Sequence, residues 1–340
     1  MTDTQIRQLI TDSGLDAEGR NFRLAETHIS WVLLSGGDAY KVKKPVKFDF
    51  LDFSTLEKRH HFCQRELELN SRFSQGVYLE VLPITRSVAG LAIGGEGEVI
   101  GHTLHMKRLE EGRQMNLLLE KGLVTNRHMQ QLAEKLAVFH AYTDIIERPP
   151  DIDAMQADFA DIESVADGLE SLLGPSAKQR LLESTAFAKG CVEGLSGRLK
   201  ERGLRGYIID GHGDLHSRNI FLVNEPILFD CIEFNDRFRQ VDVLDELAFL
   251  CMDLDYYGCR HLEAPLLNAY LKENDCITGD EDWAVFTYFK WYRANVKLKV
   301  NALRARQSTS GTRPAIRNAV EEYWQLYQAY YHQLLHEEMG

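Results

Sequence analysis

The segment H-G-D-L-H-S-R-N-I-F-L at 212–222 constrains what this chain can fold into more than any other stretch. Its acid Asp214 and its amide Asn219 stand five positions apart, and an apolar run begins directly after the amide. The turn-forming sequence N-E-P and a second apolar run follow, and they end at another acid, Asp230. This order predicts two short strands joined by a hairpin, which would bring Asp230 back beside Asn219.

Two carboxylates and an amide in this arrangement suit phosphoryl transfer. Asp214 would orient an attacking hydroxyl, while Asn219 and Asp230 would hold Mg2+ on the phosphates of a nucleotide. His212 is grouped with the catalytic residues, and we expect it to brace the loop rather than to transfer protons. The simpler alternative is an ordinary solvated loop, but the predicted strands, the turn and the second acid all favour the catalytic interpretation.

The segment resembles the H-G-D-x-H-x-x-N motif of aminoglycoside phosphotransferases, in the protein-kinase-like superfamily. More closely, the chain resembles the bacterial group called aminoglycoside phosphotransferase family enzymes. The shared stretches are A-Y-K-V-K-K-P-V at 39–46, F-L-D-F-S-T-L-E at 50–57 and F-D-C-I-E-F at 229–234. Some members carry an extra C-terminal P-loop kinase domain. The printed sequence holds no G-x-x-x-x-G-K-[ST], so we expect the form without it.

This resemblance implies a bilobal α+β fold of the protein-kinase-like type. The first hundred residues predict about five strands and one long helix, which fits an N-lobe with an antiparallel sheet. We therefore expect an N-lobe at 1–108 and a mainly helical C-lobe at 109–340 that contains the catalytic loop and the metal site. The long helix is predicted at 54–73, opened by a capping box from Ser54 to Glu57.

Two lysines are candidates for binding the nucleotide phosphates. Lys41 and Lys43 share one face of a predicted strand with Ala39, and the A-x-K order resembles the third strand of kinases. We expect Lys41 to reach the phosphates, with Lys43 as the fallback. Glu66 on the long helix is the expected partner of Lys41. A solvated basic strand and an exposed carboxylate are the alternatives.

No glycine-rich phosphate loop precedes these strands. The turn at that place reads A-E-T-H-I-S, and we expect its backbone amides, or the hydroxyls of Thr27 and Ser30, to contact phosphate. Met106 falls at the predicted hinge, where the backbone would meet the adenine edge, or else it belongs to the core.

Three further expectations concern acids beyond the motif. Asp242 or Asp245 is expected to hold the backbone of the catalytic loop. Glu233 and Asp236 follow the metal ligand closely, and they are guessed to meet the substrate.

Composition bears on partners and location. The net charge of −12 argues against nucleic acid or an anionic membrane surface as the main partner. The six cysteines show no C-x-x-C pair, which favours reduced thiols. No apolar run of about eighteen residues and no signal-like N-terminus occur, so a cytoplasmic protein is expected. The sequence indicates neither the oligomeric state nor the acceptor.

The predicted activity is transfer of the γ-phosphate of ATP, with Mg2+, to a hydroxyl group of a small molecule. Alternatives are a protein kinase or self-kinase, an enzyme that transfers AMP, and a nucleotide-binding pseudokinase. The last would require loss of a catalytic acid or metal ligand, yet Asp214, Asn219 and Asp230 are all present.

Overall fold

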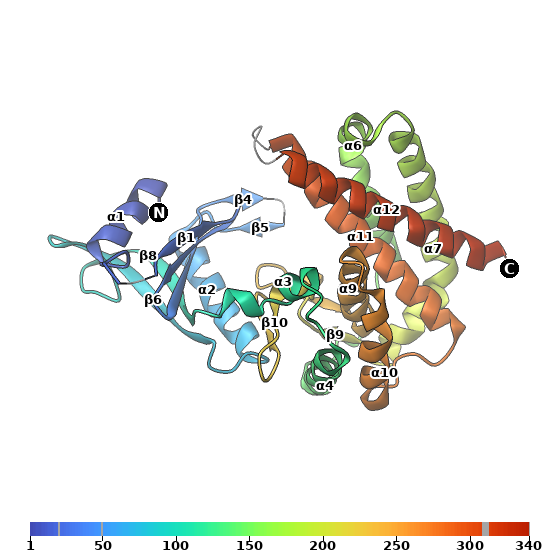
Figure 1. The fold of residues 1–340 in the computed structure, drawn as a ribbon, viewed down its shortest axis with the longest axis horizontal. Coiled ribbons are helices and arrows are strands. Elements are labelled where there is room, and N and C mark those ends of the chain that lie inside the picture. Colours follow the sequence, from blue (N-terminus) through green and yellow to red (C-terminus); the bar gives the residue numbers. More distant parts are fainter. Residues whose placement is uncertain (20, 49, 308–312, 340) are drawn as a thin grey trace. The chain divides into compact units, whose positions relative to one another are not determined.

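The computed structural model describes residues 1–19, 21–48, 50–307 and 313–339. The chain forms two compact units (Figure 1). The first unit comprises Met1–Leu118, His212–Asp214 and Arg218–Arg239, and the second comprises Leu119–Gly211, Leu215–Ser217 and Gln240–Gly340. Most of the catalytic segment therefore groups with the N-terminal sheet. The lobe boundary at residue 108 stays a prediction.

A six-stranded antiparallel sheet organises the first unit, in the order β1-β2-β3-β8-β6-β7. The strands are β1 (Arg23–Glu26), β2 (Ser30–Ser35), β3 (Asp38–Lys43), β6 (Tyr78–Ser87), β7 (Gly90–Ile93) and β8 (Glu98–Lys107). Ser35 pairs with Asp38, so a two-residue turn joins β2 to β3. Gly36 in that turn has a φ of 60°, a conformation that glycine adopts without steric cost. The predicted strands are confirmed.

Helix α2 (Leu56–Ser71) is the long helix that the sequence predicted. Its N-cap is Thr55, whose side chain accepts the Lys58 N–H, and not Ser54 as expected. The reason is local: both the N–H and the hydroxyl of Ser54 bond to Asp52 Oδ1, so Thr55 is left to cap the helix.

Smaller elements complete the first unit. Helix α1 (Asp3–Asp12) buries Ile6, Leu9 and Ile10 in a cluster with sheet residues. Two short hairpins and two short helices are also present: β4 (Lys47–Phe48) with β5 (Leu51–Asp52), β10 (Ile220–Phe221) with β11 (Ile227–Leu228), α3 (Met115–Glu120) at the border of the two units, and α8 (Asp236–Arg239).

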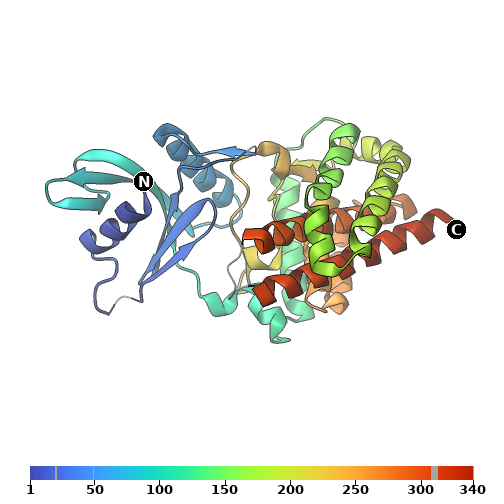
Figure 2. The ribbon, with the colours of Figure 1, turned by 90° about the horizontal axis from the view of Figure 1, so that it is seen from above.

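The second unit is mainly helical. Its helices are α4 (Asn126–Tyr142), α5 (Ile152–Ala160), α6 (Ala166–Leu173), α7 (Ser176–Leu204), α9 (Val243–Tyr256), α10 (Glu263–Glu273), α11 (Asp280–Gln307) and α12 (Arg313–Met339). A two-stranded sheet joins β9 (Ile208–Asp210) to β12 (Gln240–Asp242). Helix α11 packs along α12 and against α9, as Figures 1 and 2 show.

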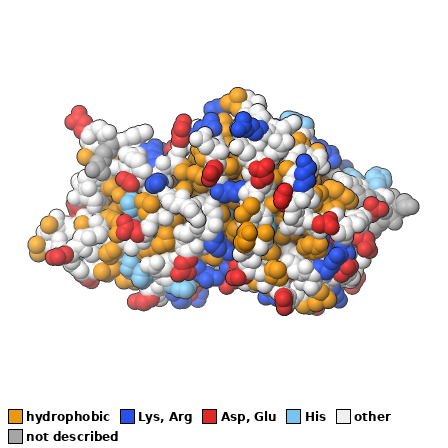
Figure 3. All heavy atoms as spheres, turned by 90° about the horizontal axis from the view of Figure 1, so that it is seen from below, with side chains coloured by type: hydrophobic (Ala, Val, Ile, Leu, Met, Phe, Trp, Pro, Cys, Tyr) orange, Lys and Arg blue, Asp and Glu red, His pale blue; other side chains and the backbone are white. Residues whose placement is uncertain are grey.

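Aromatic side chains fill the core of the second unit. Trp291 on α11 is fully buried, and Phe159 and Tyr327 pack against it. Phe286, Tyr288 and Phe289 of α11 belong to the same core, whereas Trp283 is exposed. Across the described residues, no helix combines the length and apolar character that a membrane span requires. On the face drawn in Figure 3, acidic and basic side chains are interspersed among apolar ones.

Candidate active site

The catalytic hairpin forms as the sequence predicted. Ile220 pairs with Leu228 in the β10–β11 ladder, and the Phe229 N–H donates to the Asn219 carbonyl oxygen at 3.0 Å. Asn219 thus lies opposite Phe229, the residue that precedes Asp230. This register explains how two polar side chains eleven positions apart in sequence come to the same end of the hairpin.

Asp214 and Asn219 contact each other directly. Asn219 Nδ2 donates to the backbone oxygen of Asp214 and to its Oδ2, each at 3.0 Å. The amide nitrogen is thereby used within the loop, and the amide oxygen is the atom of Asn219 that suits a cation. The structure brings together the predicted catalytic acid and one predicted metal ligand.

His212 is fully buried and braces this loop. Its Nε2 lies 3.0 Å from the Phe229 carbonyl oxygen, and its Nδ1 accepts the Asp214 N–H at 3.3 Å. These partners require the proton on Nε2. The ring also stacks on Phe73, with centroids 5.3 Å apart. The contacts link the start of the loop to the strand that precedes Asp230, in agreement with the bracing role predicted for His212.

Asp230 has a strained backbone. Its φ is 62°, and among the described residues it is the only non-glycine with a positive φ. The left-handed region is sparsely populated by residues that carry a Cβ. The Asp230 N–H donates to Tyr78 Oη at 2.9 Å, and the next N–H, from Cys231, donates to Asn70 Oδ1 at 3.0 Å.

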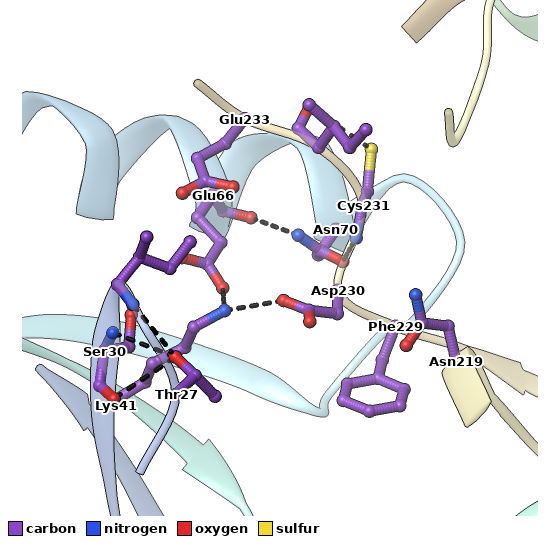
Figure 4. Close-up of polar contacts among 12 residues, drawn as sticks. Thr27, Ser30, Lys41, Glu66, Asn70, Asn219, Phe229, Asp230, Cys231 and Glu233 are labelled. Atoms are coloured by element: carbon purple, nitrogen blue, oxygen red, sulfur yellow. Dashed lines mark hydrogen bonds and ion pairs between the residues drawn. The ribbon is translucent and has the colours of Figure 1, made fainter. Parts of the chain in front are cut away.

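The side chain of Asp230 meets the predicted phosphate-binding lysine. Asp230 Oδ1 lies 2.6 Å from Lys41 Nζ, and Lys41 Nζ lies 2.7 Å from Glu66 Oε1 (Figure 4). The predicted Lys41–Glu66 contact is therefore confirmed. Glu66 is fully buried, whereas the Asp230 side chain is 44% exposed.

Lys43 contacts the same glutamate from the other side. Its Nζ lies 2.6 Å from Glu66 Oε2 and also bonds to Glu233. Only 1% of the Lys43 side chain is exposed, against 13% for Lys41. Both lysines are therefore near the helix carboxylate, but Lys41 is the one that contacts Asp230. Which of the two binds phosphate stays a prediction.

The charged groups of this cluster shift one another's pKa values. Burial raises the pKa of Glu66, but the ammonium groups of Lys41 and Lys43 outweigh it and lower the pKa from 4.5 to about 2. Burial lowers the pKa of Lys41, but Asp230 and Glu66 outweigh it, so its pKa lies well above the ordinary value. Glu66 and Lys41 therefore stay charged at neutral pH.

Ser30 and Met106 lie in less open surroundings than the prediction required. Ser30 is fully buried, and across the described residues its Oγ has no hydrogen-bond partner. Thr27 Oγ1 accepts the Ser30 N–H at 3.0 Å, so the Thr27 hydroxyl already takes part in a hydrogen bond within the turn. Met106 is 8% exposed and packs in one cluster with Ala39 and Tyr78. The core alternative for Met106 thus has direct support, and a nucleotide contact for either residue stays a prediction.

The two acids expected to meet the substrate both form ion pairs, but the Asp236 side chain is 52% exposed, so its contact with a substrate stays a prediction. Glu233 is 4% exposed and bonded to Lys43, so it does not face an incoming substrate. Asp236 bonds to Arg65 and Arg239.

Neither of the two acids expected to hold the catalytic loop does so. Asp242 pairs with Arg202 and caps α9, and Asp245 pairs with Arg293. The bond to the loop comes from Asp253, whose Oδ2 accepts the N–H of Ser217 at 2.8 Å. Asp253 lies on the same helix as Asp245, two turns later, and no motif marked it.

Tyr78 and Asn70 were also missed. Neither residue type has a catalytic signature, and the only sequence signal was the spacing of Asn70 four positions after Glu66, which puts both on one face of the helix. For Tyr78, no pattern indicated its role.

The donor set fits Mg2+. Asn219 and Asp230 provide amide and carboxylate oxygens, the hard ligands that this ion takes, with few protein ligands and the remainder from phosphates and water. The 44% exposure of the Asp230 side chain leaves it open to such a partner. No group of three or more His, Cys, Asp or Glu side chains able to hold a metal is found among the described residues.

Sequence comparison finds relatives of unknown activity. No family model matches the chain. Uncharacterised proteins of Mycobacterium bovis and Mycobacterium tuberculosis are 34% identical over 291 residues, which is 83% of this chain and 55% of those proteins. The chain therefore spans about half the length of the curated relatives it matches.

Solved structures share the fold at low identity. A choline/ethanolamine kinase family protein from Mesorhizobium loti matches with a TM-score of 0.56 and 13% identity, covering 99% of both chains. A glucosamine kinase in complex with glucosamine, ADP and inorganic phosphate matches with a TM-score of 0.53 and 13% identity, over 94% of this chain and 81% of that one. The GDP complex of aminoglycoside 2'-phosphotransferase-IIIa matches with a TM-score of 0.50 and 12% identity, over 98% of this chain and 99% of that one.

Proposed function

Since the chain has the protein-kinase-like α+β fold that its resemblance to aminoglycoside phosphotransferases implied, we propose that it is a Mg2+-dependent phosphotransferase. It moves the γ-phosphate of ATP to a hydroxyl group of a small molecule. The observation that carries this proposal is the meeting of Asp230 with the Lys41–Glu66 pair. The neighbours act on choline or ethanolamine, glucosamine and aminoglycosides by name, and two of them hold ADP or GDP, which supports a nucleotide donor and a small acceptor.

The binding half of the mechanism belongs to four side chains. Asn219 and Asp230 would hold Mg2+, which would supply positive charge to the phosphates. Lys41 neutralises charge on the same phosphates, and Glu66 keeps its ammonium group in place. The cluster is buried on the Glu66 side and open on the Asp230 side, so these charges act where water competes least.

The chemical half belongs to Asp214. Its carboxylate orients the acceptor hydroxyl and takes the proton as the O–H bond breaks and the acceptor oxygen bonds to the γ-phosphorus. The bond from the γ-phosphorus to the β–γ bridging oxygen breaks in the same step, and ADP leaves with that oxygen. Asn219 Nδ2 fixes Asp214 Oδ2 by a bond of 3.0 Å, and this removes the freedom of the carboxylate to turn away.

A transfer assay tests the proposal. Purified protein is incubated with γ-labelled ATP or GTP, Mg2+, and a panel of amino alcohols, amino sugars and aminoglycosides, beside Asp214→Asn. Asp167→Asn is the matched control, because the Asp167 side chain is 87% exposed and lies in the second unit. We expect a labelled small molecule with wild type and with the control, and none with Asp214→Asn.

The same assay separates the alternatives. Label on protein alone would indicate a protein kinase or self-kinase. Transfer from α-labelled but not from γ-labelled ATP would indicate movement of AMP. Mg2+-dependent binding of ATP without any transfer would favour the pseudokinase, and each of these results would replace the proposed activity.

We extend the proposal to a cytoplasmic enzyme whose partner is its small-molecule acceptor rather than nucleic acid or a membrane. The free thiols of all six cysteines support a reducing compartment, and the net charge of −12 supports a partner that is not polyanionic.

A further inference from the structure

Two side chains outside the motif bind the backbone at the predicted metal ligand. Tyr78, the first residue of β6, places its hydroxyl oxygen 2.9 Å from the Asp230 nitrogen. Asn70 on α2 places Oδ1 3.0 Å from the Cys231 nitrogen, as Figure 4 shows. Two successive N–H groups thus donate to side chains from two different elements.

These bonds fall at the strained position of the hairpin segment. A φ of 62° at Asp230 costs free energy that the surroundings must supply, because a residue with a Cβ disfavours this region. If the residue returned to an extended conformation, its side chain would leave the place where it meets Lys41. The two acceptors stabilise the conformation in which that contact exists.

Both acceptors are themselves firmly held. Asn70 is fully buried and its Nδ2 donates to the Glu66 carbonyl oxygen at 2.9 Å. Tyr78 is 5% exposed and packs with Met106 and Leu104 in the sheet cluster. Burial raises the pKa of Tyr78 well above its ordinary value, so its hydroxyl stays protonated.

The residues just after α2 fasten the same segment. Ser74 donates its hydroxyl to the Leu228 carbonyl oxygen, and Phe73 stacks on His212. Helix α2 and the residues directly after it therefore carry Glu66 and three attachment points of this region, and Tyr78 on β6 adds a fourth.

We propose that Tyr78 and Asn70 are positioning residues, which hold Asp230 in its left-handed conformation so that its carboxylate can bind Mg2+. This inference rests on the proposed function. It assigns no chemical step to either residue. Its consequence is specific: the two side chains set the affinity for Mg2+ on the nucleotide and not the affinity for the nucleotide itself.

The test compares nucleotide binding with and without the metal. ATP affinity is measured by calorimetry in Mg2+ and in EDTA, and amide hydrogen exchange is followed in the peptide that contains 229–232. The variants are Tyr78→Phe, which keeps the buried ring, and Asn70→Leu, which keeps a similar volume. The controls are Tyr142→Phe, at an 88% exposed site, and Ser71→Ala, whose hydroxyl bonds only within α2.

In wild type, Mg2+ should raise the affinity for ATP. Loss of one acceptor for a buried N–H should make this increase about tenfold smaller. We expect this in both variants, together with faster exchange at 229–232 and an unchanged affinity in EDTA. The controls should match wild type.

Three results would overturn the inference. The first is that Mg2+ raises the ATP affinity of both variants as much as that of wild type. The second is that the variants lose ATP affinity equally in Mg2+ and in EDTA. The third is that amide hydrogen exchange at 229–232 is as slow as in wild type. A wild-type protein that gains no affinity from Mg2+ would instead overturn the proposed function, and the inference with it.

Discussion

Lys41 and Asp230 stand 189 positions apart in the sequence, yet the ammonium nitrogen of one lies 2.6 Å from a carboxylate oxygen of the other. The same ammonium group also contacts Glu66, which is fully buried. Of the two carboxylates that contact Lys41, only that of Asp230 is exposed enough to release Lys41 and bind a metal ion instead. A metal ion at Asp230, as the proposed function requires, would therefore compete with Lys41 for this carboxylate.

The two lysines should behave differently when truncated. Lys41→Ala leaves Glu66 paired with Lys43, so we expect a folded protein whose ATP affinity is about tenfold to a hundredfold weaker, as for loss of a charged hydrogen bond. Lys43→Ala removes the ammonium group that contacts Glu233 and the Oε2 atom of Glu66. These buried oxygens then lack their cationic partner, which should lower the free energy of unfolding by about 3–5 kcal/mol.

Calorimetry with ATP and urea unfolding separate these effects. Lys47→Ala is the control, because that side chain is 72% exposed, and it should change the free energy of unfolding by no more than about 0.5 kcal/mol. A loss of ATP affinity in Lys43→Ala but not in Lys41→Ala, with both proteins folded, would reverse the assignment.

Asp214→Asn should remove turnover and keep nucleotide binding. An asparagine oxygen still accepts from Asn219 Nδ2, so the loop geometry persists, while the side chain can no longer take a proton. We expect kcat to fall by roughly 10²–10⁴-fold, with ATP affinity unchanged. Steady-state kinetics on whichever acceptor the transfer assay identifies, beside ATP calorimetry, measure both. Full turnover in this variant would contradict the role of Asp214.

The sequence predicted those parts of the site that depend on local pattern. The hairpin before Asp230 followed from two apolar runs and a turn, and the Lys41–Glu66 contact followed from the resemblance of the A-x-K strand and the long helix to those of kinases. The choice between Lys41 and Lys43 did not follow, because both lie on one face of the strand and both contact Glu66. Only the exposure and the bond to Asp230 distinguish them.

Contacts that depend on tertiary packing could not be predicted. Asp242 or Asp245 was expected to hold the catalytic loop, but arginines from other helices, Arg202 and Arg293, bind them instead. The loop contact passed to Asp253. Likewise, the strained conformation of Asp230 and its hydrogen bond to Tyr78 form only when the sheet and the hairpin pack together.

His102 should make stability depend on pH. Its ring stacks on His60 at 4.0 Å, and burial, with the nearby charges of His60 and Arg59, lowers its pKa from 6.5 to about 4. Between these pH values the unfolded chain binds a proton that the folded chain does not, so the free energy of unfolding falls as pH falls from about 6.5 to about 4.

The matched variant is His102→Gln, which cannot take up the proton. Because the ring is only half-buried, we expect a contribution of about 1 kcal/mol after allowance for solvent screening. Urea unfolding at pH 7 and pH 4.5 should show a smaller loss of stability for the variant than for wild type. Equal losses in the two proteins would mean that His102 titrates normally.

Gly213 should not tolerate a side chain. Its φ is 81°, and a Cβ at this position would lie 2.5 Å from the Phe238 carbonyl oxygen and 3.0 Å from the Arg239 Cα. Both obstacles are backbone, so the loop that carries Asp214 must shift. We expect Gly213→Ala to lower the free energy of unfolding by about 2–4 kcal/mol and to reduce transfer activity.

Gly122→Ala separates the clash from the backbone strain. Gly122 has a φ of 64°, but nothing lies within 4 Å of its added Cβ, so only the left-handed conformation is penalised, at about 1–2 kcal/mol. Urea unfolding and turnover are compared for the two variants. The proposed site requires that Gly213→Ala lose more stability than Gly122→Ala and that it alone lose turnover. Equal losses of stability with full turnover would mean that the loop accommodates the methyl group without moving Asp214.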